Sequence, residues 1–405
     1  MTAFTESAID PPLANSYLTL LPNDGGIAPP APPSESSTVL ERVLPTIDLK
    51  RLTSRGAKER KACADAMARA ASEWGFFQLT NHGVSRELME KMRREQARLF
   101  RLPFETKEKA GLLNGSYRWG NPTATSLRHL SWSEAFHVPL ARISGKHCDF
   151  GELTSLGCVM QEVAEAMSRV ANTVVAALAE KLTGHDAGAA AFPPGCDKMT
   201  CFLRLNRYPA CPFAADTFGL VPHTDSDFLT VLCQDQVGGL HLMKDSCWVT
   251  VKPRPDTLIV NIGDLFQAWS NDTYKSVEHK VVANAKSDRL SIAYFLCPSY
   301  DAFIGTCGEP SPYRAFTFRE YRSKAYSNDT YKSVEHNVVA NVKSDRLSIA
   351  YFLCPSYDAF IGTCVEPSPY RAFTFGEYRS KVQDDVGRTG KKIGLPNFLK
   401  CSLVQ

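Results

Sequence analysis

The stretch FLTVLCQDQVGGLHLMKDSCWVTV, residues 228–251, joins short apolar, β-prone runs through brief turns. Similar runs cover residues 201–207, 257–262, 278–284 and 290–296. Many short strands separated by turn residues are typical of β-barrels and β-sandwiches. We therefore predict that this half of the chain folds as a barrel or a sandwich.

The preceding half has the periodicity of helices instead. In residues 154–183, apolar side chains recur every three or four positions, and Gly184 provides a stop. Further helices are expected at 57–74 and 86–101, and short strands at 44–49 and 74–79. The pattern predicts a mostly helical region over 44–195, followed by a β-rich core over 199–324.

Residues 1–43 are rich in Pro, Ser and Ala and have few periodic apolar positions. A segment of this composition buries too little apolar surface to fold alone. We expect a flexible leader.

A tandem repeat precedes the C-terminal segment 382–405. Residues 268–324 recur as residues 325–381, with differences at Trp269/Tyr326, Lys280/Asn337, Ala285/Val342, Gly308/Val365 and Arg319/Gly376. Two copies are too few for a solenoid, which needs about three or more stacked units to bury a continuous core. We interpret residues 325–381 as a recent tandem duplicate, or as an error in the gene model.

The composition excludes several classes of protein. The 405 residues are 44% hydrophobic, as in a globular protein, and 46 Lys and Arg oppose 43 Asp and Glu without a basic run, which argues against nucleic acid as a partner. The thirteen cysteines lack CxxC spacing and are expected to be reduced. No signal peptide or long apolar segment is evident. We expect a protein of the cytoplasm or nucleus, without membrane association or an obligatory protein partner.

Two histidines and one aspartate have the spacing of a metal site. His223 and Asp225 are two residues apart, which on a β-strand places both side chains on one face. His279 lies in a strand-like run, far enough along the chain for the intervening strands to return to the same place. A 2-His-1-carboxylate set leaves positions open on iron for a cosubstrate and O₂. We predict that these three residues are the Fe(II) ligands and the catalytic centre.

Arg289 and Ser291 also share one face of a predicted strand. The planar guanidinium suits bidentate binding of a distal carboxylate, and the serine hydroxyl can add a hydrogen bond. The alternative is that Arg289 is a surface charge and that the histidines are structural. The ordered set HxD, H and RxS favours the functional interpretation.

Several motifs occur together in one order: Leu44-Pro45-Thr46-Ile47-Asp48-Leu49, Trp74-Gly75-Phe76-Phe77, Asn81-His82-Gly83, Asn206-Arg207-Tyr208-Pro209, His223-Thr224-Asp225, Asn261-Ile262-Gly263-Asp264, His279 and Arg289-Leu290-Ser291. With them, residues 44–300 resemble the plant 2-oxoglutarate- and Fe(II)-dependent dioxygenases. The segments 117–122, 131–137 and 201–211 resemble more narrowly the gibberellin 2-oxidases that act on C20 gibberellins.

The resemblance implies a mainly β fold with added α-helices: a double-stranded β-helix, or jelly roll, with the helical N-terminal half packed outside. It implies Fe(II), 2-oxoglutarate and O₂, with ascorbate as a supporting reductant. Tyr208 matches the family's additional cosubstrate tyrosine. For a gibberellin as the small-molecule substrate, hydroxylation at C2-β would deactivate the hormone, and Tyr117, Arg118 and Trp119 would line its pocket or serve a structural role.

Two alternatives stay open: a dioxygenase acting on another plant metabolite such as a flavonoid, and an inactive product of the duplication. The third ligand and the cosubstrate residues could also come from the second copy, as His336, Arg346 and Ser348. We choose the first copy because Gln267-Ala268-Trp269 continues into it without interruption.

Overall fold

The computed structural model describes residues 8–17, 40–121, 124, 130–143, 148–184, 200–212, 217–307, 311–313, 315–323, 360–361, 371, 373–389 and 397. The chain forms two compact units, Met1–Ala315 and Phe316–Gln405. His336, Arg346 and Ser348 of the second copy lie outside the described residues.

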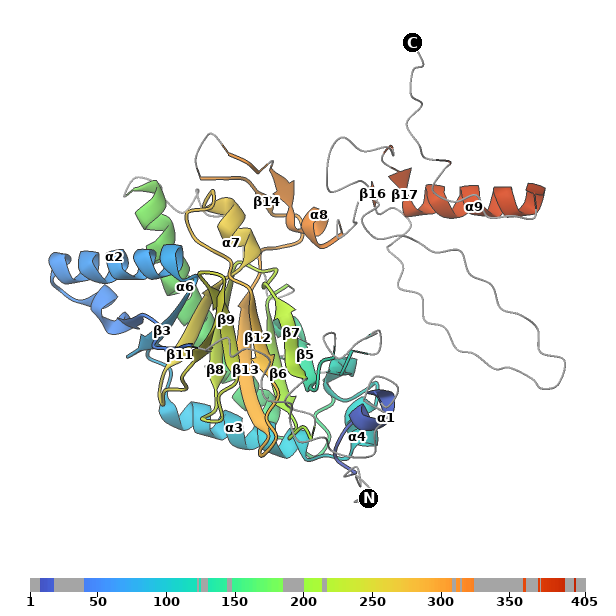
Figure 1. Cartoon of the computed structure of the whole chain (residues 1–405), viewed down its shortest axis with the longest axis horizontal. Coiled ribbons are helices and arrows are strands. Elements are labelled where there is room, and N and C mark those ends of the chain that lie inside the picture. Colours follow the sequence, from blue (N-terminus) through green and yellow to red (C-terminus); the bar gives the residue numbers. More distant parts are fainter. Residues whose placement is uncertain are drawn as a thin grey trace, which may run out of the picture. The chain divides into compact units, whose positions relative to one another are not determined.

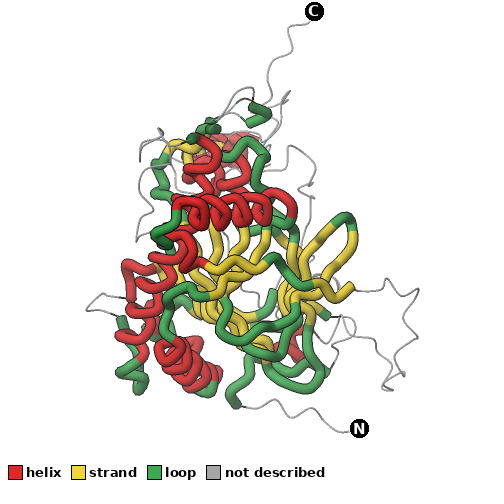
Figure 2. Tube along the Cα trace, turned by 90° about the vertical axis from the view of Figure 1, so that its left-hand side faces the viewer, coloured by secondary structure: helices red, strands yellow, loops and turns green. Residues whose placement is uncertain are grey.

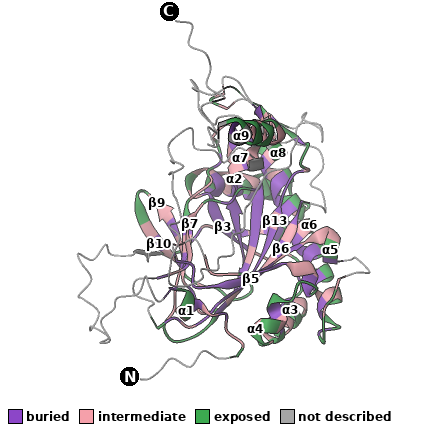
Figure 3. Ribbon diagram, turned by 90° about the vertical axis from the view of Figure 1, so that its right-hand side faces the viewer, coloured by how far each residue is buried: buried purple, intermediate pink, exposed green. Residues whose placement is uncertain are grey.

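An eight-stranded sheet, here called the major sheet, dominates the first unit (Figure 1). Its order is β2 (Thr46–Asp48), β3 (Phe76–Thr80), β11 (Leu258–Ile262), β8 (Leu229–Gln234), β13 (Arg289–Leu296), β6 (Phe202–Tyr208), β5 (Glu134–Pro139) and β4 (Tyr117–Trp119). Neighbouring strands are antiparallel except β2 and β3. Most residues of its central strands are buried (Figure 3).

A five-stranded sheet, here called the minor sheet, completes the core. Its order is β1 (Leu40–Arg42), β10 (Cys247–Val251), β9 (Leu240–Lys244), β12 (His279–Val282) and β7 (Phe218–His223). One apolar cluster joins residues of both sheets: Phe76, Tyr208 and Ile259 come from the major sheet, and Leu242 and Val281 from the minor sheet. Of the two expected architectures, the sandwich is therefore present. The predicted runs form β2, β3, β6 and β8 to β13, whereas β1, β4, β5 and β7 lie outside them.

The first unit also contains helices, some of which contact strands of the major sheet. They include α2 (Ala57–Glu73), α3 (Arg86–Phe100) and α6 (Leu156–Thr183), with shorter segments η2 (Leu49–Thr53), α4 (Phe104–Glu108), η3 (Leu113–Gly115), α5 (Leu140–Ile143) and α7 (Asp264–Trp269). The apolar stripe of α6 is buried, and α6 contacts β8, β13, α2 and α3. Figure 2 shows this layering of helices against strands. None of the helices in the described part of the chain is long and apolar enough to cross a membrane.

Part of the expected flexible leader is folded onto the first unit. Residues 8–17 include α1 (Leu13–Tyr17), in which Leu13 and Tyr17 are each only 2% exposed. They pack against Leu130 and Trp132. The segment has too few apolar residues to fold alone, but those few are buried against the sheet edge.

The repeat is visible in the local structure. The elements β14 (Phe303–Ile304), β15 (Phe316–Thr317) and α8 (Phe318–Ser323) recur at the equivalent residues as β16 (Phe360–Ile361), β17 (Phe373–Thr374) and α9 (Phe375–Thr389). In the second unit β16 pairs with β17 in antiparallel register. Where the second copy is described, the same local sequence therefore forms the same two short strands and begins a helix at the equivalent residue.

Candidate metal centre

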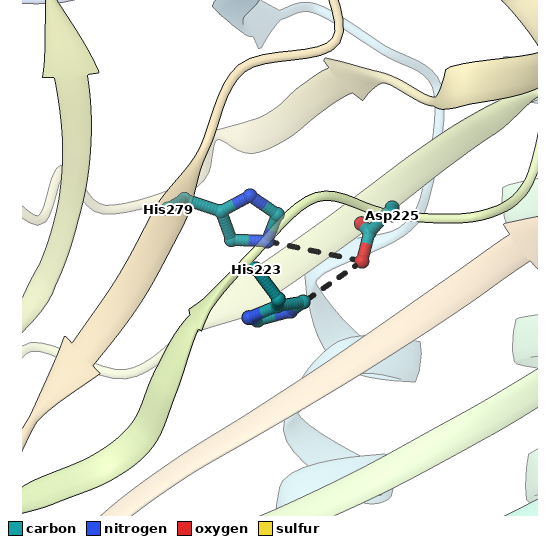
Figure 4. A group of neighbouring side chains, drawn as sticks. All are labelled: His223, Asp225 and His279. Carbon is teal, nitrogen blue, oxygen red and sulfur yellow. Dashed lines mark ion pairs between the residues drawn. The ribbon is translucent and has the colours of Figure 1, made fainter. Parts of the chain in front are cut away.

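Three side chains meet where β7 and β12 lie side by side (Figure 4). His223 ends β7, His279 begins β12, and the two residues are opposite each other in the antiparallel register. Their Nε2 atoms lie 3.6 and 3.8 Å from Oδ1 of Asp225. The three potential ligand atoms are all within 4.8 Å of one another. This arrangement suits a single cation.

Backbone contacts fix the tautomer of both rings. Nδ1 of His223 lies 2.8 Å from the carbonyl oxygen of Val221, and Nδ1 of His279 lies 3.1 Å from that of Val277. Because a carbonyl oxygen can only accept, each Nδ1 carries the proton. Each Nε2 therefore presents a lone pair toward the centre, as a metal-bound imidazole requires.

The second carboxylate oxygen of Asp225 is held by two side chains. Oδ2 accepts hydrogen bonds from Thr230 Oγ1 and from Asn261 Nδ2, both at 2.7 Å. These donors leave Oδ1 facing the two imidazoles. Thr230 belongs to β8 and Asn261 to β11, so the major sheet orients a ligand that follows a strand of the minor sheet.

The electrostatics prepare the site for a cation. Burial opposes ionisation of Asp225, but the surrounding donors and charges, led by His223, outweigh it and hold the pKa of this carboxyl below its ordinary value. Burial lowers the pKa of His279. Burial also opposes protonation of His223, but the adjacent Asp225 outweighs it and raises the pKa of His223. An anionic Asp225 therefore attracts positive charge, which a bound metal ion can provide in place of a proton.

A second cluster lies on the inner face of the major sheet, around Arg289. This residue begins β13 and is only 2% exposed. Its Nη2 donates to Oε1 of Gln234 at 3.0 Å, whereas its Nε and Nη1 are buried without a hydrogen-bond partner among the described residues. A buried guanidinium without an anion is unfavourable. The carboxylate of a ligand would supply the missing acceptor.

The neighbouring positions add further donors. Ser291 pairs in register with Asn206 of β6 and with Gln234 of β8. Its Oγ accepts a hydrogen bond from Asn206 Nδ2 at 3.3 Å, so the hydroxyl proton stays available to a ligand. Nε2 of Gln234 is buried without a partner. Adjacent strands thus place unused donors on one face.

Tyr208 completes this cluster. It pairs with Arg289 in register, and the Arg289 Cζ atom lies 5.0 Å from the centre of the Tyr208 ring. Gly219 of β7 leaves room for the ring, because a Cβ at this glycine would overlap Tyr208. The structure therefore groups the predicted cosubstrate residues Tyr208, Arg289 and Ser291.

The three predicted substrate residues lie on β4, at the edge of the major sheet. Tyr117 donates to Oε2 of the fully buried Glu134 at 2.5 Å. Burial and then the Glu134 charge raise the pKa of Tyr117, which keeps the hydroxyl protonated. Arg118 is exposed, and Trp119 packs edge-on against Phe104. These contacts give Tyr117 and Trp119 structural partners, while a substrate role for the three residues stays a prediction.

Thr230, Gln234 and Asn261 were not predicted as site residues. Asn261 belongs to a motif that the sequence analysis singled out without assigning it a role. Thr230 and Gln234 are polar positions inside an apolar strand, which is the signal that could have identified them. Asp225, the partner of Thr230 and Asn261, follows β7, and Arg289, the partner of Gln234, belongs to β13. The arrangement of the strands is therefore needed to assign a role.

The chain matches two family profiles. The profile of the 2OG-Fe(II) oxygenase superfamily matches residues 199–298, and that of the non-haem dioxygenase in morphine synthesis N-terminal matches residues 44–146. The chain is 70% identical to gibberellin 2-beta-dioxygenase 6 of Oryza sativa subsp. japonica, over all of both chains. It is 50% identical to gibberellin 2-beta-dioxygenase 8 of Arabidopsis thaliana, over 78% of this chain and 94% of the relative.

Solved structures also resemble the chain. The structure of JOX2 in complex with 2OG, Fe and JA aligns with a TM-score of 0.60 and 32% identity, over 71% of this chain and 86% of that one. The dioxygenase for auxin oxidation of rice aligns with a TM-score of 0.56 and 31% identity, over 69% of this chain and 93% of that one. With the two facing sheets, these likenesses imply a jelly-roll core.

Proposed function

The chain belongs to the 2OG-Fe(II) oxygenase superfamily, and we propose that it hydroxylates gibberellins at C2-β, with C20 gibberellins as the preferred substrates. The observation that carries this proposal is the 70% identity to a gibberellin 2-beta-dioxygenase over the whole of both chains. Hydroxylation at C2 withdraws the hormone or its precursor from the active pool. The similarity favours a gibberellin over a flavonoid.

We assign the Fe(II) ligands to His223, Asp225 and His279. Both Nε2 lone pairs and Oδ1 of Asp225 converge on one point, and their 2-His-1-carboxylate chemistry fits iron with positions left open. When bound, Fe(II) supplies the coordination sites and redox chemistry for oxidative decarboxylation of 2-oxoglutarate coupled to hydroxylation of the substrate. The residues of the chain hold the reactants in place and exclude water.

The residues around Arg289 fit the distal carboxylate of 2-oxoglutarate. The two guanidinium nitrogen atoms without a partner among the described residues, and the Ser291 hydroxyl, are the donors that such a carboxylate needs. The Tyr208 ring supports the guanidinium from one side. Because Arg289 and Ser291 are almost fully buried, their hydrogen bonds to the cosubstrate are shielded from water.

We also propose that the N-terminal helices α2, α3 and α6 form an outer layer that supports the jelly roll. Contacts of α6 with β8 and β13 support this assignment, since these strands carry Thr230 and Arg289. The helices would then stabilise the metal centre indirectly, by keeping the major sheet in register.

The proposal is tested with full-length protein, Fe(II), 2-oxoglutarate, ascorbate and a C20 gibberellin, with mass-spectrometric identification of the product. We expect a C2-β-hydroxylated product and stoichiometric succinate. Hydroxylation of flavonoids but not gibberellins would contradict the substrate assignment. Soluble protein that binds neither iron nor 2-oxoglutarate would favour the inactive product of the duplication.

Two variants test which copy of the repeat completes the site. His279→Ala is expected to abolish Fe(II) binding and turnover, whereas His336→Ala retains both. The equivalent positions in the repeat make the two variants a matched pair. Loss confined to His336→Ala would show that the second copy supplies the ligand while leaving the enzyme class intact.

A further inference from the structure

On the inner face of the major sheet, the exposure of the side chains increases next to the metal centre. Asn206, Ser291 and Gln234 are buried on this face. Two residues from Asn206 along β6, on the same face, Arg204 is half-exposed, and so is its neighbour His137 on β5. The next step reaches Phe202 and Phe295, which are also half-exposed. Arg204, His137, Phe202 and Phe295 are therefore partly accessible on a face that is otherwise largely buried, and these four side chains are here called the wall.

Register places this wall beside the iron ligands. Phe295 pairs with Thr230, whose hydroxyl holds Asp225. Phe202 stacks on Phe295 with ring centres 4.3 Å apart, and His137 stacks on Phe202 at 3.8 Å. The stacked rings form an apolar surface of the kind that binds a hydrophobic small molecule.

Arg204 is the cation on this wall. It pairs in register with Ala293 on one side and with His137 on the other. Its Nε donates to Oδ1 of Asn206 at 2.9 Å. On the same face, the next residue of β6 is Phe202, which stacks on Phe295, and Phe295 pairs in register with Thr230.

No acidic side chain of the described residues forms an ion pair with Arg204. The contrast with Arg207 on the same strand is informative, because Arg207 faces the other side of the sheet and pairs with Asp10, Glu134 and Asp288 at 2.6–2.8 Å. The outward arginine has three carboxylates, whereas the inward arginine has none in the part of the chain that the structure describes. A half-buried guanidinium that pairs with no carboxylate of the described residues, beside the stacked rings, suits an anionic ligand.

We propose that Arg204 binds the carboxylate on C4 of a C20 gibberellin and thereby selects C20 over C19 gibberellins. The inference rests on the proposed function. C2 and C4 belong to the same ring, so a carboxylate on C4 remains near the iron when C2 is presented for hydroxylation. In C19 gibberellins this carboxylate is closed into a lactone with C10 and carries no charge. The cation therefore distinguishes the two classes by charge, while the stacked rings contact the shared apolar skeleton.

The distal carboxylate of 2-oxoglutarate is the competing partner for Arg204. It already has a cation of its own, because Arg289 lies further along the sheet with two unused donors. Along the inner face, Arg204 lies between the cluster around Arg289 and the position where Phe295 pairs with Thr230. Arg204 is therefore nearer than Arg289 to the strand position that holds the iron ligand Asp225. The geometry therefore assigns Arg289 to the cosubstrate and Arg204 to the substrate.

The test is anaerobic calorimetric titration of the full-length protein, loaded with Fe(II) and 2-oxoglutarate, with a C20 gibberellin diacid and with a C19 gibberellin lactone. A charge-assisted pair predicts that the wild type binds the diacid about 10- to 100-fold more tightly. Arg204→Gln removes most of this preference and Arg204→Lys keeps part of it. Arg86→Gln, at an exposed position of α3, is the control and keeps the full preference.

Three results would overturn the role of Arg204: an unchanged preference in Arg204→Gln, equal binding of diacid and lactone by the wild type, or a loss of 2-oxoglutarate affinity as large as the loss for the diacid. Admission of O₂ then separates the two proposals. Selective binding without a C2-hydroxylated product contradicts the proposed reaction but supports Arg204 as the carboxylate ligand. Wild type that binds neither gibberellin overturns both.

Discussion

The substitution Gln234→Glu is expected to place a carboxylate of the protein next to Arg289, where the distal carboxylate of 2-oxoglutarate would otherwise bind. Oε1 of Gln234 accepts a hydrogen bond from Arg289 at 3.0 Å, and no carboxylate among the described residues compensates the buried guanidinium. The substitution keeps the length of the side chain and adds a negative charge at the atom that already contacts Arg289. The protein then carries the anion that the cosubstrate otherwise provides.

The magnitude follows from two charges competing for one cation. Two carboxylates about 5 Å apart in an effective dielectric constant of about 20 repel by roughly 3 kcal/mol. This corresponds to about a 100-fold loss of 2-oxoglutarate affinity. Gln234→Met removes only the hydrogen bond, for which we expect about 1 kcal/mol, or roughly a fivefold loss.

Anaerobic titration of the Fe(II)-loaded variants with 2-oxoglutarate measures these affinities. The thermal midpoint without cosubstrate should stay constant or rise in Gln234→Glu, because the new carboxylate pairs with Arg289. The KM for the gibberellin, at saturating 2-oxoglutarate, should be unchanged. The reasoning is refuted if Gln234→Glu binds 2-oxoglutarate within about threefold of the wild type, since the expected repulsion is far larger.

Two further predictions concern the metal centre and the pH dependence of stability. Thr230→Val removes a donor to Asp225 at nearly constant shape and should weaken Fe(II) binding about 10-fold or more. Thr230→Ser keeps the hydroxyl and should retain the Fe(II) affinity. Equal Fe(II) affinities of the metal-free Thr230→Val and Thr230→Ser proteins would contradict this prediction. Burial, with a smaller contribution from Lys280, lowers the pKa of His241 to about 4. Between its ordinary pKa of 6.5 and about 4, the unfolded state binds a proton that the folded state does not, so stability falls as the pH falls through this window. In urea unfolding of the metal-free protein, His241→Gln should show a smaller fall than the wild type over this range, and parallel curves would exclude this residue as a cause.

The sequence predicts features that depend on local periodicity. The apolar spacing of α6 identifies the helix and its buried face, and the short β-prone runs identify the strands. Contacts between distant strands are different, because they depend on register. Gln234 contacts Arg289 only because β8 lies beside β13, 55 residues apart in sequence. Nothing in the local pattern around Gln234 indicates this partner.

The leader illustrates the same limit from the other direction. Its composition predicts a segment that cannot fold alone. That reasoning does not address docking onto a preformed surface, where Leu13 and Tyr17 are buried. Asp10 also pairs with Arg207 at 2.8 Å, an interaction that needs the edge of the sheet to exist first. Composition therefore describes the isolated segment, and contacts with the rest of the fold determine that Leu13 and Tyr17 are buried.

The duplication provides a test of how far the local sequence determines the fold. Deletion of residues 325–381 or of residues 268–324 leaves one copy in either case, and the two products differ only at the five positions that distinguish the copies. Both should therefore fold and bind Fe(II) and 2-oxoglutarate. In the first copy Lys280 lies 3.8 Å from the Trp248 ring centre, whereas the second copy has Asn337 at the equivalent position. Loss of this cation–π contact costs about 0.5–2 kcal/mol.

The protein that retains the first copy should consequently have the higher urea midpoint. Restoring lysine at the other junction, by Asn337→Lys in the protein that lacks 268–324, should recover most of the difference. If only one deletion product folds, the five differing positions change the free energy of folding by more than their contacts predict. If the full-length chain is less soluble than both deletion products, the spare copy interferes with assembly, because two nearly identical sequences compete for the places of β12 and β13 in the sheets.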